Sequence, residues 1–252
     1  MKAMILAAGL GTRLRPLTDD RPKALVEIDG RTLLDITLSR LRSFGVCEAI
    51  INVHHFADMI AEHLKANNNF GMNIEISRED ALLDTGGGLK KAAYFFLQGS
   101  ADATGHPEKP FIVHNVDVLS TIDLRSMVQF HSDHEALATL AVQDRKTSRH
   151  LLFDDRLQLC GRRIGNDQPE LVGGLQPACA LAFSGIHVVS PRLLAMLSEE
   201  GAFSIISSYL RLAADGEKIL AFRADEYYWR DLGKPENVAQ AAQDLKQGVV
   251  SL

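Results

Sequence analysis

The chain has 252 residues, enough for one large α/β domain or two small ones, and 46% of them are hydrophobic, which supports a full core. A net charge of −5 disfavours nucleic acid as the main partner. No apolar run approaches the roughly 20 residues of a membrane span, so we do not expect membrane insertion. Three scattered cysteines without a CxxC pair, and an N-terminus without a signal-peptide layout, predict a cytoplasmic protein with no disulfide framework and no zinc site.

Apolar segments alternate with helical patterns through the first half of the chain. Residues 3–7 form an apolar run that is typical of a buried strand, and Thr32 with Asp35 has the spacing of a helix-starting capping box. Further strands are predicted at 49–53, 73–77 and 111–113, with amphipathic helices between them. This rhythm predicts an α/β fold with a Rossmann-like mixed, mainly parallel sheet, helices on both faces and ligands at the carboxyl ends of strands.

The second half of the chain has a different pattern. We predict strands at 136–142, 178–189, 218–222 and 227–231, a hairpin at 150–160, and helices at 123–131, 204–213 and from 235 onward. The polar, glycine-bearing residues 99–110 and 161–177 predict loops, the second of them a possible lid. His131 and His134 have helical spacing but no third ligand, so we expect a solvated helix face there. Nothing marks a linker, which favours a single domain over 1–252, with a nucleotide-binding half (1–120) and a substrate-facing half (121–252).

The first 23 residues carry the strongest functional signal. The opening strand runs into Gly9-Leu10-Gly11-Thr12-Arg13. This string is followed by Pro16 and then by Pro22-Lys23. A buried strand that feeds a glycine-rich turn brings backbone N–H groups up to phosphate, and Arg13 and Lys23 supply the matching positive charge. The string lacks the Gly-Lys-Ser/Thr of a Walker A motif, and Pro16 disfavours the immediate long helix of a GxGxxG motif. These features predict a nucleoside triphosphate site.

The same string, from Leu6 to Lys23, resembles the signature of the sugar-1-phosphate nucleotidylyltransferases. Four later motifs also resemble motifs of that family: Asp84-Thr85-Gly86-Gly87-Gly88, Asn115-Val116-Asp117, Phe183-Ser184-Gly185-Ile186 and Trp229-Arg230-Asp231-Leu232-Gly233. The resemblance covers almost the whole chain, and its length leads us to expect no C-terminal β-helix of the kind that some relatives carry. It implies an enzyme of nucleotide-sugar synthesis, which transfers a nucleotidyl group from an NTP to a sugar 1-phosphate, releases pyrophosphate and uses Mg²⁺.

The resemblance also implies roles for individual residues. Arg13 is the cation for the β- and γ-phosphates, and Lys23 is the cation for the sugar phosphate and the α-phosphoryl oxygens. Asp117 and Asp231, each at a strand end, are the expected Mg²⁺ ligands, although each could instead be a cap or a salt-bridge partner. The expected nucleotide contacts are Ala7, Ala8, Gly9, Gly11, Thr12, Glu79, Thr85 and Gly87. Glu79 could equally be a surface carboxylate. Asn115 and Gly185 are the expected sugar contacts.

Two departures from the family pattern concern the sugar. Val116 stands where the family has a glycine, so its side chain either points into the core or reshapes the sugar pocket. The Glu-Lys-Pro that many relatives use near the sugar is absent from residues 161–177. The substrate pair therefore stays open. UTP with an amino-sugar 1-phosphate such as N-acetylmuramate 1-phosphate is the first expectation, and GTP with mannose or heptose 1-phosphate is the alternative.

Two further functions also stay open at this point. A cytidylyltransferase for a non-sugar phosphate such as phosphocholine would use the same opening loop, and a nucleotide-sugar sensor could have kept binding without catalysis. The four intact charged residues Arg13, Lys23, Asp117 and Asp231 disfavour the sensor. We expect a monomer or a small homo-oligomer.

Overall fold

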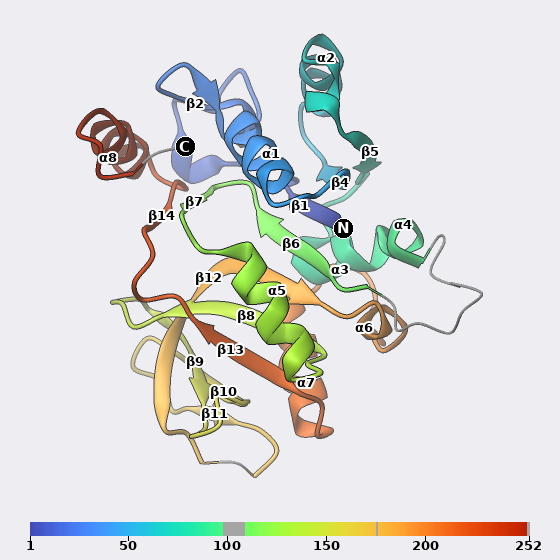
Figure 1. The fold of residues 1–252 in the computed structure, drawn as a ribbon, viewed down its shortest axis with the longest axis vertical. Helices are drawn as coiled ribbons and strands as arrows, with labels where there is room; N and C mark the ends of the chain where they lie inside the picture. Colours follow the sequence, from blue (N-terminus) through green and yellow to red (C-terminus); the bar gives the residue numbers. More distant parts are fainter. Residues whose placement is uncertain (98–108, 175, 251–252) are drawn as a thin grey trace.

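A mixed ten-stranded sheet runs through the computed structural model, which describes residues 1–97, 109–174 and 176–250 (Figure 1). Its parallel part contains β1 (Lys2–Leu6), β4 (Glu48–Val53), β5 (Asn73–Arg78) and β6 (Phe111–Asn115). The remaining strands are β8 (Ala138–Gln143), β9 (Arg149–Phe153), β10 (Leu159–Ile164), β11 (Glu170–Leu171), β12 (Cys179–Val189) and β13 (Ile219–Arg223). Most of the polar loop expected at 99–110 lies outside the described residues.

Strand order explains how the two halves join. The sheet has the order β11-β10-β9-β12-β6-β1-β4-β5, and β8 pairs with both β12 and β13. β1 is parallel to its neighbours β4 and β6, whereas β12 runs antiparallel to β6, β8 and β9. The long strand β12 of the second half therefore lies beside β6 of the first half and joins the two halves into one sheet.

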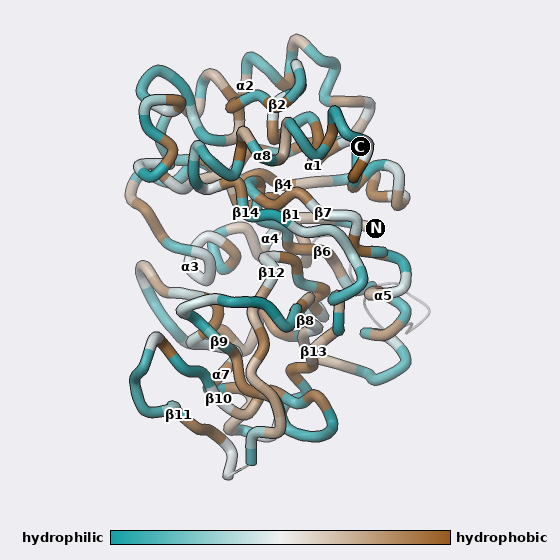
Figure 2. The backbone as a smooth tube through the Cα atoms, turned by 90° about the vertical axis from the view of Figure 1, so that its left-hand side faces the viewer, coloured by the Kyte–Doolittle hydropathy of each residue, from teal (hydrophilic) through white to brown (hydrophobic). Residues whose placement is uncertain are grey.

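Helices cover both faces of the sheet, as predicted. Alternate residues of β1 point to opposite sides: Ala3 and Ile5 belong to one buried cluster, and Met4 and Leu6 to the other. The first cluster includes residues of α1 (Leu33–Ser43), α2 (Ala57–Ala66), α5 (Leu124–Asp133) and α8 (Pro235–Lys246). The second includes residues of α3 (Asp84–Lys91), α4 (Ala93–Leu97), α6 (Arg192–Ala195) and α7 (Ile205–Ala214). Figure 2 shows hydrophobic stretches along the inner strands and hydrophilic ones on outer turns.

Local sequence signals account for several element boundaries. The predicted capping box is confirmed: Thr32 Oγ1 accepts a hydrogen bond from Asp35 N at 3.1 Å, and Asp35 Oδ2 accepts one from Thr32 N at 3.2 Å. Asp29 and Gly30 both have positive φ, which suits the tight turn between β2 (Glu27–Ile28) and β3 (Arg31–Thr32). Among the described residues, no helix is long and apolar enough to cross a membrane.

The expectation of a loop over residues 161–177 is wrong for part of that segment. β10 continues to Ile164, and β11 pairs with it. A Cβ atom added at Gly161 would overlap the carbonyl oxygen of Glu170, so this glycine allows the two strands to approach closely. The glycine that suggested a loop therefore marks a contact within the sheet.

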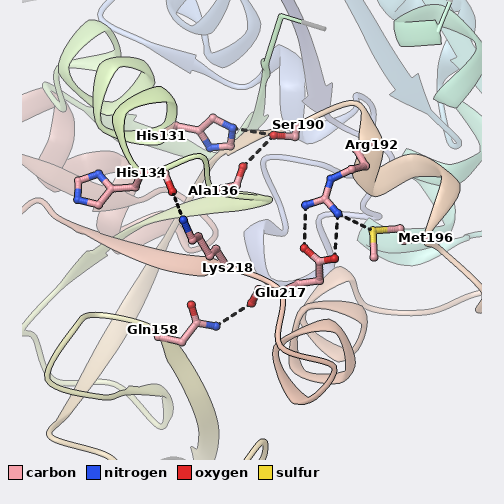
Figure 3. Close-up of polar contacts among 9 residues, drawn as sticks. All are labelled: His131, His134, Ala136, Gln158, Ser190, Arg192, Met196, Glu217 and Lys218. Atoms are coloured by element: carbon pink, nitrogen blue, oxygen red, sulfur yellow. Dashed lines mark hydrogen bonds and ion pairs between the residues drawn. The ribbon is translucent and has the colours of Figure 1, made fainter. Parts of the chain in front are cut away.

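The expectation of a solvated helix face is wrong for His131 and correct for His134. His131 is only 3% exposed because α5 packs that side against β8 and β12. Its Nε2 lies 3.0 Å from Ser190 Oγ (Figure 3). Its Nδ1 lies 3.0 Å from Thr139 Oγ1. His134 is exposed on the same helix. His131 is therefore a buried residue with both ring nitrogens hydrogen-bonded.

Buried histidines make the fold sensitive to acid. Burial lowers the pKa of His131 to about 4, that of His114 to about 4 and that of His187 to about 3. Below the usual pKa of 6.5 the unfolded chain binds these protons and the native state does not, so stability falls as the pH falls.

We expect His131→Gln to reduce the slope of unfolding free energy against pH by about 1.4 kcal/mol per pH unit between roughly pH 6 and 4.5. Urea unfolding at several pH values measures this slope. His134→Gln is the matched control, and an unchanged slope in His131→Gln would contradict the prediction.

Candidate active site

Buried polar groups surround the end of β1. Leu6, the last residue of β1, is in register with Asn52 of β4 and with Asn115 of β6. Asn52 Oδ1 accepts a hydrogen bond from Ala7 N at 2.8 Å, and its Nδ2 donates to Glu79 Oε1 at 2.7 Å. Glu79 Oε2 accepts from Leu83 N at 3.0 Å. This network holds the backbone where β1 becomes the glycine-rich loop.

Asn52 was not among the predicted site residues, although a polar residue inside the apolar run Ile50 to Val53 was a visible signal. Asn52 is 3% exposed and Glu79 is 4% exposed. The interpretation of Glu79 as a surface carboxylate is therefore wrong. Both of its oxygens accept hydrogen bonds within the protein, so a contact with a nucleotide base stays a prediction.

The glycine-rich loop has the conformation that its sequence requires. Ala7 and Ala8 are buried, whereas Gly9 is exposed. Gly11 has φ +66°, and a Cβ atom there would lie 3.0 Å from the methyl carbon of Thr18, whose hydroxyl donates to Gly11 O at 2.9 Å. The 3₁₀ helix η1 (Thr12–Leu14) follows, with Leu14 buried. Thr12 and Arg13 are left on the exposed side of the loop.

Lys23 and Asp117 form an ion pair across the loop. Lys23 begins the 3₁₀ helix η2 (Lys23–Leu25), and its Nζ lies 2.9 Å from Asp117 Oδ2. The two side chains are 14% and 13% exposed. Burial acts to raise the pKa of Asp117, but the charge and hydrogen bond of Lys23, with the charge of Arg13, outweigh it and hold the pKa below its usual value. A Cβ atom at Gly9 would lie 3.3 Å from Lys23 Nζ, so the ammonium group lies beside the loop backbone.

Asp231 and Arg13 meet next to this pair. The small sheet of β7 (Val118–Ser120) and β14 (Trp229–Asp231) places Asp231 opposite Val118, and Leu232 N donates to Asp117 O at 2.8 Å. A Cβ atom at Gly233 would lie 2.8 Å from Arg13 Nη2 and 2.9 Å from Asp231 Oδ1. Gly233 N donates to that same oxygen at 2.8 Å. The structure thus brings together the four predicted charged residues, from segments far apart in the sequence.

Asp117 and Asp231 suit a magnesium ion that is bound largely by substrate. Mg²⁺ commonly takes one or two carboxylates and completes its octahedral shell with phosphate oxygens and water. Over the described part of the chain, no group of three or more His, Cys, Asp and Glu side chains is placed to hold a metal ion. A pair of carboxylates beside a glycine-rich loop fits Mg²⁺, and it does not fit a metal that needs a full cage of protein ligands.

The second glycine run packs inside the protein. Gly86 N and Gly87 N both point to Phe203 O, and a Cβ atom at Gly87 would overlap Gly201 O. Thr85 Oγ1 accepts from Ile205 N at 3.0 Å, at the first residue of α7. The run therefore allows α3 to approach the segment 201–205. Its contact with a nucleotide, through Thr85 or Gly87, stays a prediction.

Asn115 and Gly185 lie side by side. Gly185 has φ +76° within an irregular part of β12, and a Cβ atom there would lie 2.9 Å from Asn115 Nδ2 and 2.9 Å from Val118 Cγ2. Val116 is 1% exposed and belongs to the core cluster that contains Ile5. Of the two alternatives for Val116, the side chain points into the core.

Arg145 also lies at this site and was not predicted. It follows β8, and its guanidinium lies over the ring of Trp229, with Cζ 3.6 Å from the ring centroid. The sequence around it, Asp144-Arg145-Lys146-Thr147-Ser148, is polar throughout and gives no reason to single out one residue. Only the folding of β14 against β8 and β12 reveals it.

Comparison with known proteins shows which sequences and folds this chain resembles. The sequence model of the Nucleotidyl transferase family matches residues 2–151. An N-acetylmuramate alpha-1-phosphate uridylyltransferase from Caulobacter vibrioides is 35% identical, over 93% of this chain and 92% of the relative. A probable mannose-1-phosphate guanylyltransferase from Oryza sativa is 28% identical over 94% of this chain, which spans 62% of that relative.

A solved structure of HddC from Yersinia pseudotuberculosis, complexed with GMP-PN, shares the fold with a TM-score of 0.75. It is 22% identical and covers 97% of this chain and 99% of its own. The predicted fold class is confirmed, and so is the resemblance to the sugar-1-phosphate nucleotidylyltransferases. From the family model and the Caulobacter relative together, this chain belongs to the nucleotidyl transferase family, a family of enzymes.

Proposed function

We propose that this protein transfers a nucleotidyl group from an NTP to a sugar 1-phosphate, giving an NDP-sugar and pyrophosphate. The observation that carries the proposal is the meeting of Arg13, Lys23, Asp117 and Asp231 at the carboxyl edge of the parallel strands. Two polyanions must be brought together in this reaction, and a site with two cations and two metal-binding carboxylates suits that task. In this proposal residues 1–120 bind the nucleotide, and residues 121–252, together with Asn115, bind the sugar.

In the reaction an oxygen of the sugar 1-phosphate forms a bond to the α-phosphorus of the NTP. The bond from that phosphorus to the oxygen that bridges the α- and β-phosphates breaks, and pyrophosphate leaves with the electron pair. The attacking oxygen is already ionised, so the protein needs no general base. Lys23, beside Gly9, neutralises charge near the α-phosphoryl group, and the fork of Arg13 binds the leaving phosphates. Asp117 and Asp231 would hold Mg²⁺, which would neutralise phosphate charge.

The best substrate pair is UTP with an amino-sugar 1-phosphate such as N-acetylmuramate 1-phosphate. The Caulobacter relative supports it, because it is named for this activity and matches the chain over nearly its whole length. GTP with mannose 1-phosphate is the second candidate, and the guanylyltransferase relative supports it. We place the reaction in the cytoplasm, where the free thiols Cys47, Cys160 and Cys179 would stay reduced.

A pyrophosphate-release screen tests the proposal. UTP, GTP, CTP and dTTP are each combined with N-acetylmuramate, N-acetylglucosamine, mannose, heptose and glucose 1-phosphates and with phosphocholine, with and without Mg²⁺. We expect Mg²⁺-dependent release that is fastest with UTP and an amino-sugar 1-phosphate. Release with GTP and mannose or heptose 1-phosphate would change the substrate assignment alone. Activity only with phosphocholine, or binding without turnover in every combination, would overturn the proposed function.

A further inference from the structure

Arg145 and Trp229 together hold the irregular part of β12 that carries Gly185. Arg145 Nη2 donates to Phe183 O at 2.7 Å, and Trp229 Nε1 donates to Ser184 O at 2.7 Å. The guanidinium plane of Arg145 covers the face of the Trp229 ring. A cation is thereby fixed in position next to the Asn115 and Gly185 contact, from a segment that carries none of the family motifs.

Strand geometry places this cation on the same side as Asp231. In the sheet of β7 and β14, Trp229 is opposite Ser120 and Asp231 is opposite Val118, so these four side chains share one face. Val118 Cγ2 lies 2.9 Å from the Cβ position of Gly185, which shows that this face is turned toward β12. Arg145 therefore lies near both Asp231 and the part of β12 that carries Gly185, and it comes from a different segment than Arg13 and Lys23 of the N-terminal loop.

The positive charge of Arg145 has no carboxylate partner within 4.0 Å among the described residues. Three other half-buried arginines of the second half are paired: Arg162 with Glu170, Arg211 with Glu199, and Arg230 with Asp244. Arg145 Nε is buried without a hydrogen-bond partner. Burial lowers the pKa of Arg145, against the opposing charge of Asp231. An unpaired, half-buried guanidinium costs desolvation energy that one carbonyl and one ring only partly offset, and an anion would offset the rest.

We propose that Arg145 binds an anionic oxygen of the sugar 1-phosphate. That oxygen belongs either to the phosphate group, which every sugar 1-phosphate carries, or to a carboxylate on the sugar, and only in the second case would the arginine select among sugars. The inference rests on the proposed function and adds a binding residue to it. Arg145 would supply, from the end of β8, a positive charge on the sugar side of the reacting groups.

The test compares Arg145→Met with the wild type for two substrates that differ by one carboxylate. N-acetylmuramate 1-phosphate carries a lactyl carboxylate that N-acetylglucosamine 1-phosphate lacks. KM is measured for each sugar 1-phosphate and for UTP by pyrophosphate release. Binding of each sugar 1-phosphate is measured in parallel by calorimetry with Mg²⁺ and a non-hydrolysable UTP analogue. Met keeps much of the packing on Trp229 and removes the charge. Arg156→Met, at an exposed turn between β9 and β10, is the control for loss of one positive charge.

We expect Arg145→Met to raise KM and the dissociation constant for the sugar 1-phosphate by about tenfold or more, with KM for UTP changed by less than about twofold. Arg145→Lys should recover part of the affinity. Weakening of both sugars identifies the phosphate as the contact, and weakening of N-acetylmuramate 1-phosphate alone identifies the carboxylate. If KM and the dissociation constants for both sugar 1-phosphates are unchanged in Arg145→Met, or if the affinities for UTP and for the sugar 1-phosphates fall equally, the inference is overturned. Turnover by the wild type would in that case still uphold the proposed function. The inference is also overturned if the wild type binds neither of these two sugar 1-phosphates. Turnover with another sugar 1-phosphate would then still uphold the proposed function.

Discussion

Asp117→Asn should reduce the rate of Mg²⁺-dependent pyrophosphate release by about a hundredfold to a thousandfold. The Asp117 carboxylate pairs with Lys23 at 2.9 Å, and the backbone carbonyl of Asp117 accepts from Leu232 N, the residue after Asp231. Asparagine keeps the shape of the side chain but removes the charge that Mg²⁺ and Lys23 both need. The loss should appear in kcat at saturating Mg²⁺, because the missing charge acts on the reacting phosphates. Steady-state kinetics over a range of Mg²⁺ concentrations measure it.

Asp123→Asn is the matched control for this variant. Asp123 is half-buried and caps α5, where its Oδ1 accepts from Arg125 N and Ser126 N. Asparagine is an equally good N-cap, so the control loses the same charge with little structural cost. Full Mg²⁺-dependent activity in Asp117→Asn would refute the metal assignment. A loss of activity in Asp117→Asn with the melting temperature unchanged would rule out unfolding as the cause.

Asn52→Leu should lower the free energy of unfolding by about 2–4 kcal/mol. The amide is almost fully buried, and its replacement leaves Ala7 N without an acceptor and Glu79 Oε1 without a donor. Leucine fits the volume and suits the apolar strand, so the cost comes from the unpaired polar groups rather than from packing. Urea unfolding monitored by circular dichroism gives the difference.

Asn73→Leu provides the comparison for Asn52→Leu, because Asn73 is exposed at the start of the neighbouring strand β5. We expect its unfolding free energy to stay within about 0.5 kcal/mol of the wild type. Adding Glu79→Gln to Asn52→Leu should recover part of the loss, since a neutral amide is less costly to bury unpaired than a carboxylate. Equal stability of Asn52→Leu and Asn73→Leu would show that the network does not support the loop.

Sequence patterns predicted the parts of the fold that depend on local chemistry. The apolar runs of β1, β4 and β6 and the Thr32–Asp35 capping box need only near neighbours in the chain, and they are found as expected. The charged residues of the site could be proposed because strand ends and a glycine-rich turn carried them. Gly161 misled the prediction because a glycine at a strand contact looks like a loop glycine until the partner strand is known.

Other features depend on contacts between distant segments, and no local pattern encodes them. Arg145 becomes notable only when Trp229 lies beneath it, and Val116 could be assigned to the core only when its surroundings were known. Thr85 belongs to a recognised motif, yet its hydroxyl bonds to the first residue of α7. Side-chain partners of this kind follow from the packing of the helices, which the sequence alone leaves undetermined.

The C-terminal helix α8 holds the segment that precedes Asp231, so its removal should disturb that part of the site. Asp244 of α8 accepts from Tyr228 Oη at 2.7 Å and from Arg230 Nη2 at 2.8 Å, and these residues flank Trp229 immediately before Asp231. Asn237 Nδ2 also donates to Asp231 O at 2.7 Å. Truncation before residue 235 would remove these anchors, which lie behind one of the two acidic side chains. We therefore expect the enzyme to need this helix, which carries none of the proposed catalytic residues, to hold Asp231 in place.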